Sequence, residues 1–118
     1  MKYMLLIYQN EQALDEATRQ ACYCESTQLA IDIAARGQYL GASPLRPTAS
    51  ATSVRVRDGK RMVTDGPFAE TREQLGGYYL VDVENLDQAI DIAARIPGAR
   101  DGTVEIRPVV ELQGLPEE

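Results

Sequence analysis

The heptapeptide Ala-Ile-Asp-Ile-Ala-Ala-Arg occupies residues 30–36 and recurs unchanged at residues 89–95. Because alanine-rich, helix-favouring residues can match by convergence, this repeat alone is weak support for a duplication. Each copy ends a stretch of helical character, and each stretch is flanked by two short apolar segments typical of strands. The order β-α-β, hairpin, β-α-β independently favours two similar halves. Two split βαβ units predict an α+β, ferredoxin-like antiparallel sheet with both helices on one face.

The first half begins with a strand and continues with a long helix. Residues 2–8 are apolar and β-prone, as in a strand at the centre of a sheet. A helix is expected from Asp15 to Arg36, with Gly37 as its C-terminal stop. The spacing of its apolar residues predicts an inward stripe made of Leu14, Ala17, Ala21, Cys24, Ile31 and Ala35. Residues 38–46, interrupted by Gly and Pro, predict a short edge strand.

Between the two halves the pattern is that of a β-hairpin. Val54 and Val56 alternate with arginines, and Asp58-Gly59 is a favoured hairpin turn. We therefore expect a hairpin insertion over residues 52–64. Residues 46–61 carry a net charge of +4, which is typical of a solvated hairpin face, although it also suits a rim that attracts anions.

The second half is expected to start with a loop over residues 65–77 and a strand over residues 78–83. Asn85 predicts the cap of a second helix, with Gln88 at its third position. The inner face of that helix is predicted to consist of Leu86, Ala89, Ala93 and Ile96. Pro97-Gly98 should end the helix, and the last strand is expected over residues 103–110.

Size and composition limit the classes of protein. The chain has 118 residues and a mass of 13.0 kDa, which predicts a single domain over residues 1–118. Its longest apolar runs are too short to span a bilayer, and no signal h-region is recognisable, so a cytoplasmic protein without a membrane partner is expected. A net charge of −6 with no histidine argues against nucleic acid as a partner. Cys22 and Cys24 point about 200° apart on a helix, which argues against a mutual disulfide or a shared metal.

A family resemblance is carried by residues 65–83, which read Asp-Gly-Pro-Phe-Ala-Glu-Thr-Arg-Glu-Gln-Leu-Gly-Gly-Tyr-Tyr-Leu-Val-Asp-Val. This stretch resembles the signature of the DGPF branch of the YCII-related family, and the opening Met-Lys-Tyr-Met-Leu-Leu-Ile-Tyr and the closing Val-Glu-Ile-Arg-Pro support it. The resemblance implies a dimeric α+β barrel, in which two sheets pack face to face. It also implies a link to regulation, since some DGPF proteins are encoded beside extracytoplasmic-function sigma factors.

The resemblance says less about activity. A His–Asp pair has been proposed as catalytic in the YCII branch, but this chain has no histidine. Only the acidic half of such a pair can survive here, and Asp65 is its best candidate. The residues themselves allow a second interpretation, in which Asp65-Gly66-Pro67 is a turn whose Asp side chain accepts from backbone N–H groups two residues on. Phe68 would then pack the loop against the core.

The residues expected around a site are polar and lie near strand ends. Asp65 is the candidate catalytic residue, acting as a general base if it is desolvated. The ligand-binding residues are predicted to be Arg46, Glu70, Arg72, Glu73 and Tyr78. The carboxylates match no EF-hand spacing, and phosphate-binding and dinucleotide motifs are absent from the sequence, so no metal and no cofactor is expected.

Two hypotheses about function remain open. One is a homodimeric module that binds a small molecule or has a regulatory role; the other is a small-molecule enzyme of hydrolase, lyase or isomerase type. The missing histidine and the turn-like Asp65-Gly66-Pro67 favour binding. A homodimer is expected because the helices cover only one sheet face. In a monomer, Arg55, Arg57 and Lys60 would have to solvate part of the other face.

Overall fold

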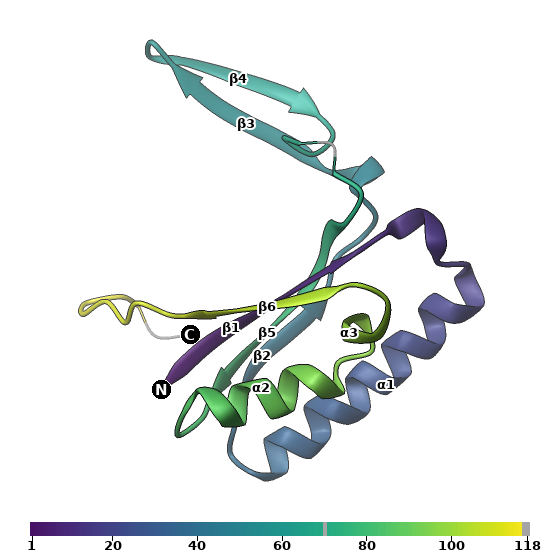
Figure 1. The fold of residues 1–118 in the computed structure, drawn as a ribbon. Helices are drawn as coiled ribbons and strands as arrows, with labels where there is room; N and C mark the ends of the chain where they lie inside the picture. Colours follow the sequence, from purple (N-terminus) through teal and green to yellow (C-terminus); the bar gives the residue numbers. More distant parts are fainter. Residues whose placement is uncertain (70, 117–118) are drawn as a thin grey trace.

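The computed structural model describes residues 1–69 and 71–116 as a body of sheet and helices with a projecting hairpin (Figure 1). The strands are β1 (Lys2–Gln9), β2 (Tyr39–Pro44), β3 (Thr52–Arg57), β4 (Lys60–Asp65), β5 (Gln74–Asp82) and β6 (Thr103–Pro108). The helices are α1 (Glu16–Ala35), α2 (Leu86–Arg95) and α3 (Gly98–Asp101), and two 3-10 turns are η1 (Glu11–Ala13) and η2 (Thr48–Ser50). Among the described helices, none has both the length and the apolar character needed to cross a bilayer.

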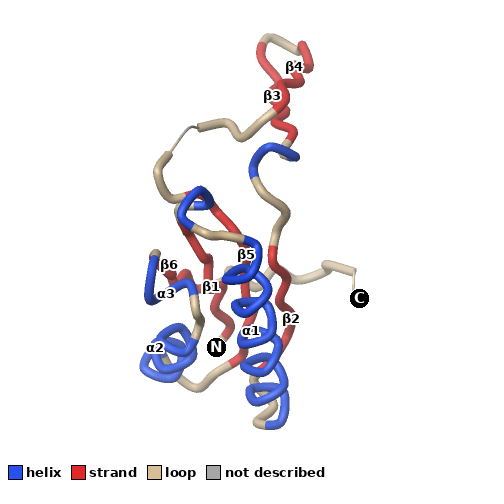
Figure 2. Tube along the Cα trace, turned by 90° about the vertical axis from the view of Figure 1, so that its right-hand side faces the viewer, coloured by secondary structure: helices blue, strands red, loops and turns tan. Residues whose placement is uncertain are grey.

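The main sheet has the strand order β2-β5-β1-β6, and each neighbouring pair is antiparallel. β5 lies between the two strands of the first half, and β1 lies between the two strands of the second half, so the halves interlock. Figures 1 and 2 show α1 and α2 on the same face of this sheet. The predicted ferredoxin-like α+β fold is therefore confirmed.

The hydrophobic core fills the space between this sheet face and the helices. Every second residue of the central strands β1 and β5 points toward the helices, as strand geometry requires. The buried apolar residues are Tyr3, Leu5, Leu29, Ile33, Tyr79, Val81, Val83, Ala89, Ile92, Ala93 and Ile96. Both halves of the chain contribute to this one core.

The helix ends follow the local signals. Asp15 caps α1 by accepting from the Thr18 N–H at 2.7 Å, and the helix stops before Gly37, whose φ is +73°. Asn85 caps α2 by accepting from the Gln88 N–H at 3.0 Å. The predicted stop and the predicted second cap are thus confirmed.

The predicted inward stripe of α1 is wrong. The residues that α1 buries are Leu29 and Ile33, whereas Ile31 is 57% exposed. Four further members of the predicted stripe are also exposed, namely Ala17, Ala21, Cys24 and Ala35. Ile31 and Ile33 point about 200° apart, so only one of them can face the sheet. Ile33 does so because Leu29 lies one turn before it, and together they bury more apolar area than Ile31 with alanines.

Three smaller predictions are also corrected. In α2, Leu86 is 49% exposed, and Ile92 takes a place in the core that was not predicted. β5 begins at Gln74, inside the predicted loop, because its first residues pair with the end of β1 beyond a bulge. Phe68 does not reach the core and is 81% exposed. Pro97-Gly98 ends α2 as predicted, but the chain then forms the extra turn α3.

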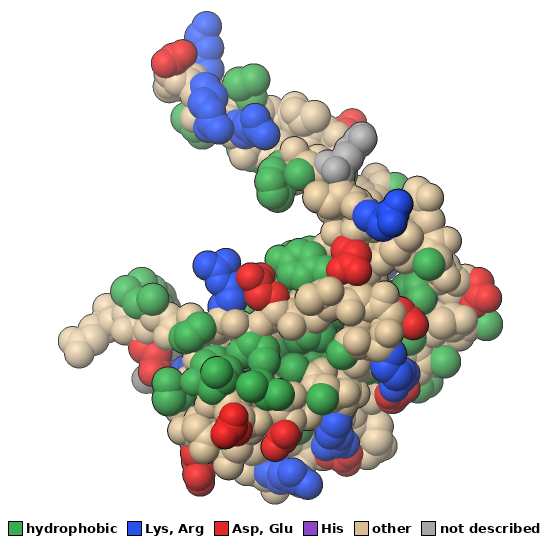
Figure 3. Space-filling model, in the orientation of Figure 1, with side chains coloured by type: hydrophobic (Ala, Val, Ile, Leu, Met, Phe, Trp, Pro, Cys, Tyr) green, Lys and Arg blue, Asp and Glu red, His purple; other side chains and the backbone are tan. Residues whose placement is uncertain are grey.

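The predicted hairpin insertion is confirmed as a separate two-stranded sheet of β3 and β4, called here the arm (residues 52–65). At its tip Asp58 and Gly59 have φ values of +53° and +73°, which suits a two-residue hairpin turn. The arm extends on the side of the sheet away from the helices (Figure 1), and Lys and Arg side chains gather at its far end (Figure 3). The radius of gyration is consequently 16.0 Å, against about 13.5 Å for a compact domain of this length.

Candidate functional site

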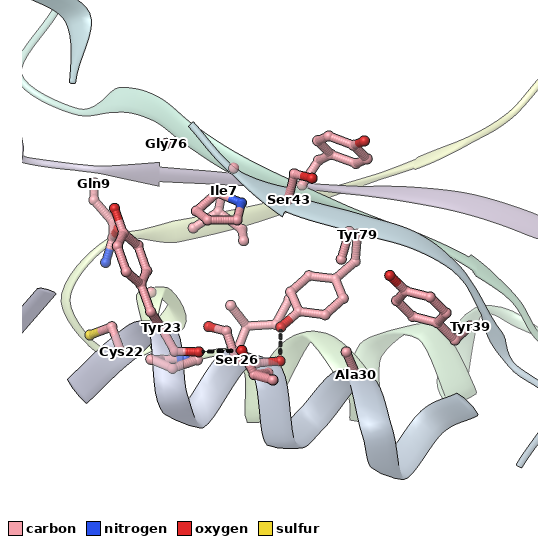
Figure 4. Close-up of a pocket in the computed structure, with 18 residues that line it drawn as sticks. Ile7, Gln9, Cys22, Tyr23, Ser26, Ala30, Tyr39, Ser43, Gly76 and Tyr79 are labelled. Carbon is pink, nitrogen blue, oxygen red and sulfur yellow. Dashed lines mark hydrogen bonds between the residues drawn. The ribbon is translucent and has the colours of Figure 1, made fainter. Parts of the chain in front are cut away.

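A cavity of about 260 Å³, called here the α1 cavity, lies between α1 and the strands β2 and β5 (Figure 4). Its apolar lining comes from Ile7, Ala30, Ala42, Pro44, Ile96 and Pro97. Polar residues that line it are Gln9, Cys22, Tyr23, Ser26, Thr27, Tyr39, Ser43, Tyr78 and Tyr79. Among the residues that the structure describes, no Asp, Glu, Lys or Arg borders this cavity. Its wall is therefore apolar, with hydroxyl, thiol and amide groups but no permanent charge.

Small residues leave this space open. Gly76 and Gly77 of β5, Ala42 of β2 and Ala30 of α1 all border the cavity. A Cβ atom on Gly77 would lie 3.0 Å from the Ser43 carbonyl oxygen, so a larger residue there would push β2 away from β5. The Gly76-Gly77 pair thus serves close strand approach and cavity formation together.

Tyr79 joins the two walls of the cavity. Its hydroxyl donates to the Ser26 backbone carbonyl on α1 at 2.6 Å, and only 3% of the residue is exposed (Figure 4). Burial raises the pKa of the Tyr79 hydroxyl above its ordinary value. The hydroxyl therefore stays neutral, and its proton is already used in the hydrogen bond to Ser26. Tyr79 thus connects β5 to α1 and is not suited to act as a general base.

Cys22 contributes a half-buried thiol at one end of the cavity. Burial raises its pKa, although the Arg100 guanidinium nearby opposes that shift. Arg100 itself is held by Glu25 through two hydrogen bonds of 2.7 and 2.9 Å. A thiol with a raised pKa is mostly protonated at neutral pH, so Cys22 is a weak nucleophile here.

Aromatic rings are spread along the cavity. Figure 4 shows Tyr23 at the end with Gln9 and Cys22, Tyr39 at the opposite end, and Tyr79 between them. Ring faces at such positions suit a flat apolar molecule. The hydroxyls of Tyr23 and Tyr39 can donate to or accept from its polar substituents.

A second cavity, of about 580 Å³, lies at the base of the arm and is called here the arm-base cavity. It is lined by Tyr8 at the end of β1, by the segment after β2 and by the segment that leads into β5. Arg46, Phe68 and Glu73 are among its lining residues. Among the lining residues that the structure describes, it therefore combines an aromatic surface with one cation and one carboxylate.

The residues predicted to form one site do not meet in one cavity. Arg46 and Glu73 line the arm-base cavity, whereas Tyr78 borders the α1 cavity along β5, where strand alternation turns its ring to the face opposite Tyr79. Asp65 ends β4 opposite Thr52, and Asp65 and Arg72 are both exposed and are among the lining residues of neither cavity. Glu70 lies outside the described residues. The catalytic role of Asp65 stays a prediction.

The turn after Asp65 forms, but by other means than predicted. The residue two positions on is Pro67, which has no N–H to donate to the Asp65 side chain. Instead the Gly66 N–H donates to the Ala51 carbonyl at 2.7 Å, and the Ser53 hydroxyl donates to the Gly66 carbonyl at 2.7 Å. Hydrogen bonds from the segment before β3 and from β3 itself therefore hold this turn.

Sequence reasoning missed the α1 cavity because it assigned the wrong face of α1 to the interior. Tyr23, Ser26 and Ala30 follow one another at three- and four-residue spacing, on the same side as Leu29 and Ile33. That spacing was the available signal. It would have directed attention to a mixed polar and aromatic face instead of the alanine stripe.

Comparison with known proteins identifies relatives over nearly the whole chain. The family model described as the YCII-related domain matches residues 1–113. A protein of Rhizobium meliloti (strain 1021), itself described as uncharacterized, is 35% identical in an alignment that covers 92% of each chain. These matches extend through both halves of the sheet and the arm.

Proposed function

This chain belongs to the YCII-related family, and we propose that it is a homodimeric, cytoplasmic binding module of the DGPF branch that takes a small, mainly apolar molecule into the α1 cavity. The observation that carries this proposal is the uncharged, tyrosine-rich lining of that cavity. Tyr79 and Cys22 are neutral groups at neutral pH, and burial raises the pKa of each further above its ordinary value. Apolar cavities with a few placed polar groups are the usual form of small-molecule sites.

The size of the cavity indicates the size of the ligand. An apolar cavity of about 150 Å³ holds benzene, and the α1 cavity is about 260 Å³. A single substituted ring, or an aliphatic molecule of similar bulk, therefore fits.

A cavity-filling variant tests the binding role. Ala30→Phe places a ring inside the cavity, whereas Ala34→Phe, one turn later on α1, adds the same ring at an exposed position. A ligand found in a thermal-shift screen should stabilise the native protein by about 2.7 kcal/mol at a hundredfold excess over Kd. Ala30→Phe should abolish that shift and Ala34→Phe should keep it. Equal shifts in both variants would place the ligand elsewhere and contradict the proposal.

The homodimer is supported by the uncovered face of the sheet. Met4, Leu6 and Tyr8 on β1 are paired with Leu80, Tyr78 and Leu75 on β5, on the face that the helices do not cover. The arm adds exposed Val54, Val56, Met62 and Val63. A second copy packed on this face would remove both apolar surfaces from water.

Light scattering should give about twice the chain mass of 13.0 kDa. Leu80→Asp on the uncovered face should yield a monomer, whereas Leu86→Asp, on the exposed side of α2, should not. A wild-type protein that is strictly monomeric at tens of micromolar would contradict the dimer.

The cytoplasmic location is proposed from the sequence expectation alone. The link to sigma-factor regulation is supported by the DGPF resemblance. A bacterial two-hybrid assay against the sigma factor encoded nearest to the gene tests that link directly.

A second candidate function is an enzyme that uses carboxylate acid–base chemistry at Asp65. The observation that bears on it is the arm-base cavity, where Arg46 could hold an anionic substrate and where Glu73, rather than Asp65, is the lining carboxylate among the described residues. Turnover that is lost in Arg46→Gln and Asp65→Asn, but retained in Ala30→Phe, would favour this enzyme over the binding module.

A further inference from the structure

A small hollow of about 50 Å³ adjoins the α1 cavity, and the two have Gln9, Cys22, Tyr23 and Gly76 in common. We call it the Arg19 hollow, because Arg19 of α1 lines it. Because four residues border both spaces, the two spaces adjoin, and a ligand that occupied both would extend from one into the other. Together the two spaces offer an apolar end and a polar end.

Arg19 presents an unused donor at the polar end. Its Nε atom is buried, and no hydrogen-bond partner for it exists among the residues that the structure describes. Arg19 also takes part in none of the ion pairs formed within residues 1–69 and 71–116. A guanidinium is always protonated, and a buried donor left without an acceptor is costly to the folded state. Since Arg19 is half-buried and lines the hollow, a ligand's acceptor would meet the accessible part of its side chain rather than this buried Nε.

Glu11 lies in the same hollow, but its carboxylate is engaged elsewhere. Its two oxygens accept from the Thr48 N–H and the Thr48 hydroxyl, each at 2.8 Å. Glu11 thus holds the segment after β2 in place, and its negative charge limits how much anionic charge the hollow can accept. One carboxylate is accommodated more easily than a doubly charged phosphate.

We propose that Arg19 binds the carboxylate of a small aromatic monocarboxylic acid whose ring occupies the α1 cavity, an inference that rests on the proposed binding function. The planar guanidinium matches a carboxylate in shape and donor spacing. Tyr23, Tyr39 and Tyr79 provide the aromatic surroundings for the ring. The charge of the ligand lies in the Arg19 hollow, so the uncharged lining of the larger cavity contacts only its apolar part.

Calorimetric titration with matched probes tests this assignment. The acids are benzoate, phenylacetate and 3-phenylpropionate, and each has its neutral amide as a probe of the same shape. The proteins are the wild type, Arg19→Gln and the control Arg36→Gln, whose exposed side chain follows the last turn of α1 and lines neither space.

At least one acid should bind the wild type about 10- to 100-fold more tightly than its amide, as expected for a charge-assisted hydrogen bond. Arg19→Gln should remove that difference by weakening the acid alone, and Arg36→Gln should preserve it. The unfolding midpoint of ligand-free Arg19→Gln should not fall, because the donor it loses is unpaired.

Three results would overturn the role of Arg19: equal binding of acid and amide by the wild type, an unchanged preference in Arg19→Gln, or no binding of any probe. The binding module itself is judged separately. If Ala30→Phe abolishes binding of the amides while acid and amide bind equally, the module stands and only the carboxylate site fails. If probes bind but Ala30→Phe has no effect, the α1 cavity is not the site and both proposals fail.

Discussion

The strands of the body and of the arm both carry aliphatic residues, but these are buried in the body and exposed on the arm. On β1 and β5, Leu5 and Val81 are fully buried, whereas on the arm Val54 and Val56 are 60% and 61% exposed. The alternation of valine with arginine and the Asp58-Gly59 turn are enough to form the arm locally, but a lone two-stranded hairpin is marginally stable in water. Local sequence can thus specify an element whose stability must come from another surface.

Charge separates the two regions as well. The whole chain has a net charge of −6. Residues 46–61, which include most of the arm, have a net charge of +4, so the rest of the chain has a net charge of −10. In the proposed dimer, a basic arm that lies against an acidic body would favour association and set its orientation.

The largest effect is expected from Leu5→Ala, which empties a fully buried position in the body. It should lower the free energy of unfolding by about 2–5 kcal/mol in urea titrations. Val54→Ala on the arm should cost less than about 1 kcal/mol when the protein is diluted to a monomer. An equal cost for both would show that the arm already packs within its own chain.

A smaller effect is expected at Gly102, where the body leaves no room for a side chain. A Cβ atom there would overlap the Tyr8 carbonyl oxygen of β1. Gly102→Ala should therefore destabilise the body by about 1–3 kcal/mol. Gly41→Ala on β2, where a Cβ meets no atom within 4 Å, is the matched control and should be neutral. Equal midpoints for the two variants would contradict the close contact.

Lowering the pH should destabilise the body, because the carboxylates that cap α1 and form its ion pairs become protonated. The backbone N–H of Thr18 donates to Asp15 and holds the pKa of that carboxyl below its ordinary value. A lowered folded-state pKa means that the stabilisation is fully present above the unfolded value of about 3.9 and is lost as the pH falls through the folded value. Asp15→Asn keeps a cap acceptor and should flatten the acid limb of a midpoint-against-pH curve. Superimposable curves would refute this role.

The smallest effect on stability is expected at Asp65, where the arm joins the loop. Because backbone hydrogen bonds and Ser53 hold the turn, Asp65→Asn and Asp65→Ala should each change the free energy of unfolding by less than about 0.5 kcal/mol. Ligand affinity separates the roles: a loss of binding or turnover without a loss of stability would make Asp65 part of a site. Unchanged affinity in both variants would show that Asp65 is not part of the ligand site.

Elements with a local cause were predictable. The cap at Asn85 needs only the Gln88 N–H three residues on, and the turn at Asp58-Gly59 needs only two residues that tolerate positive φ. The order of strands and helices then restricts the topology to a few arrangements, of which the ferredoxin-like sheet is one. The family signature could also be recognised from the sequence, because it is a run of consecutive residues.

The candidate site depended on packing that has no local signal. Which face of α1 turns inward was decided by Leu29 and Ile33 meeting the sheet, and that choice brought Tyr23 to the α1 cavity. The unpaired Nε of Arg19 is likewise a property of its surroundings, since an arginine on a helix surface is ordinarily solvated. The chain by itself determined the elements, their ends and their order, because these rest on contacts between near neighbours. Only the tertiary structure decided which faces are buried and where space remains, because burial and cavities arise from residues far apart in the chain.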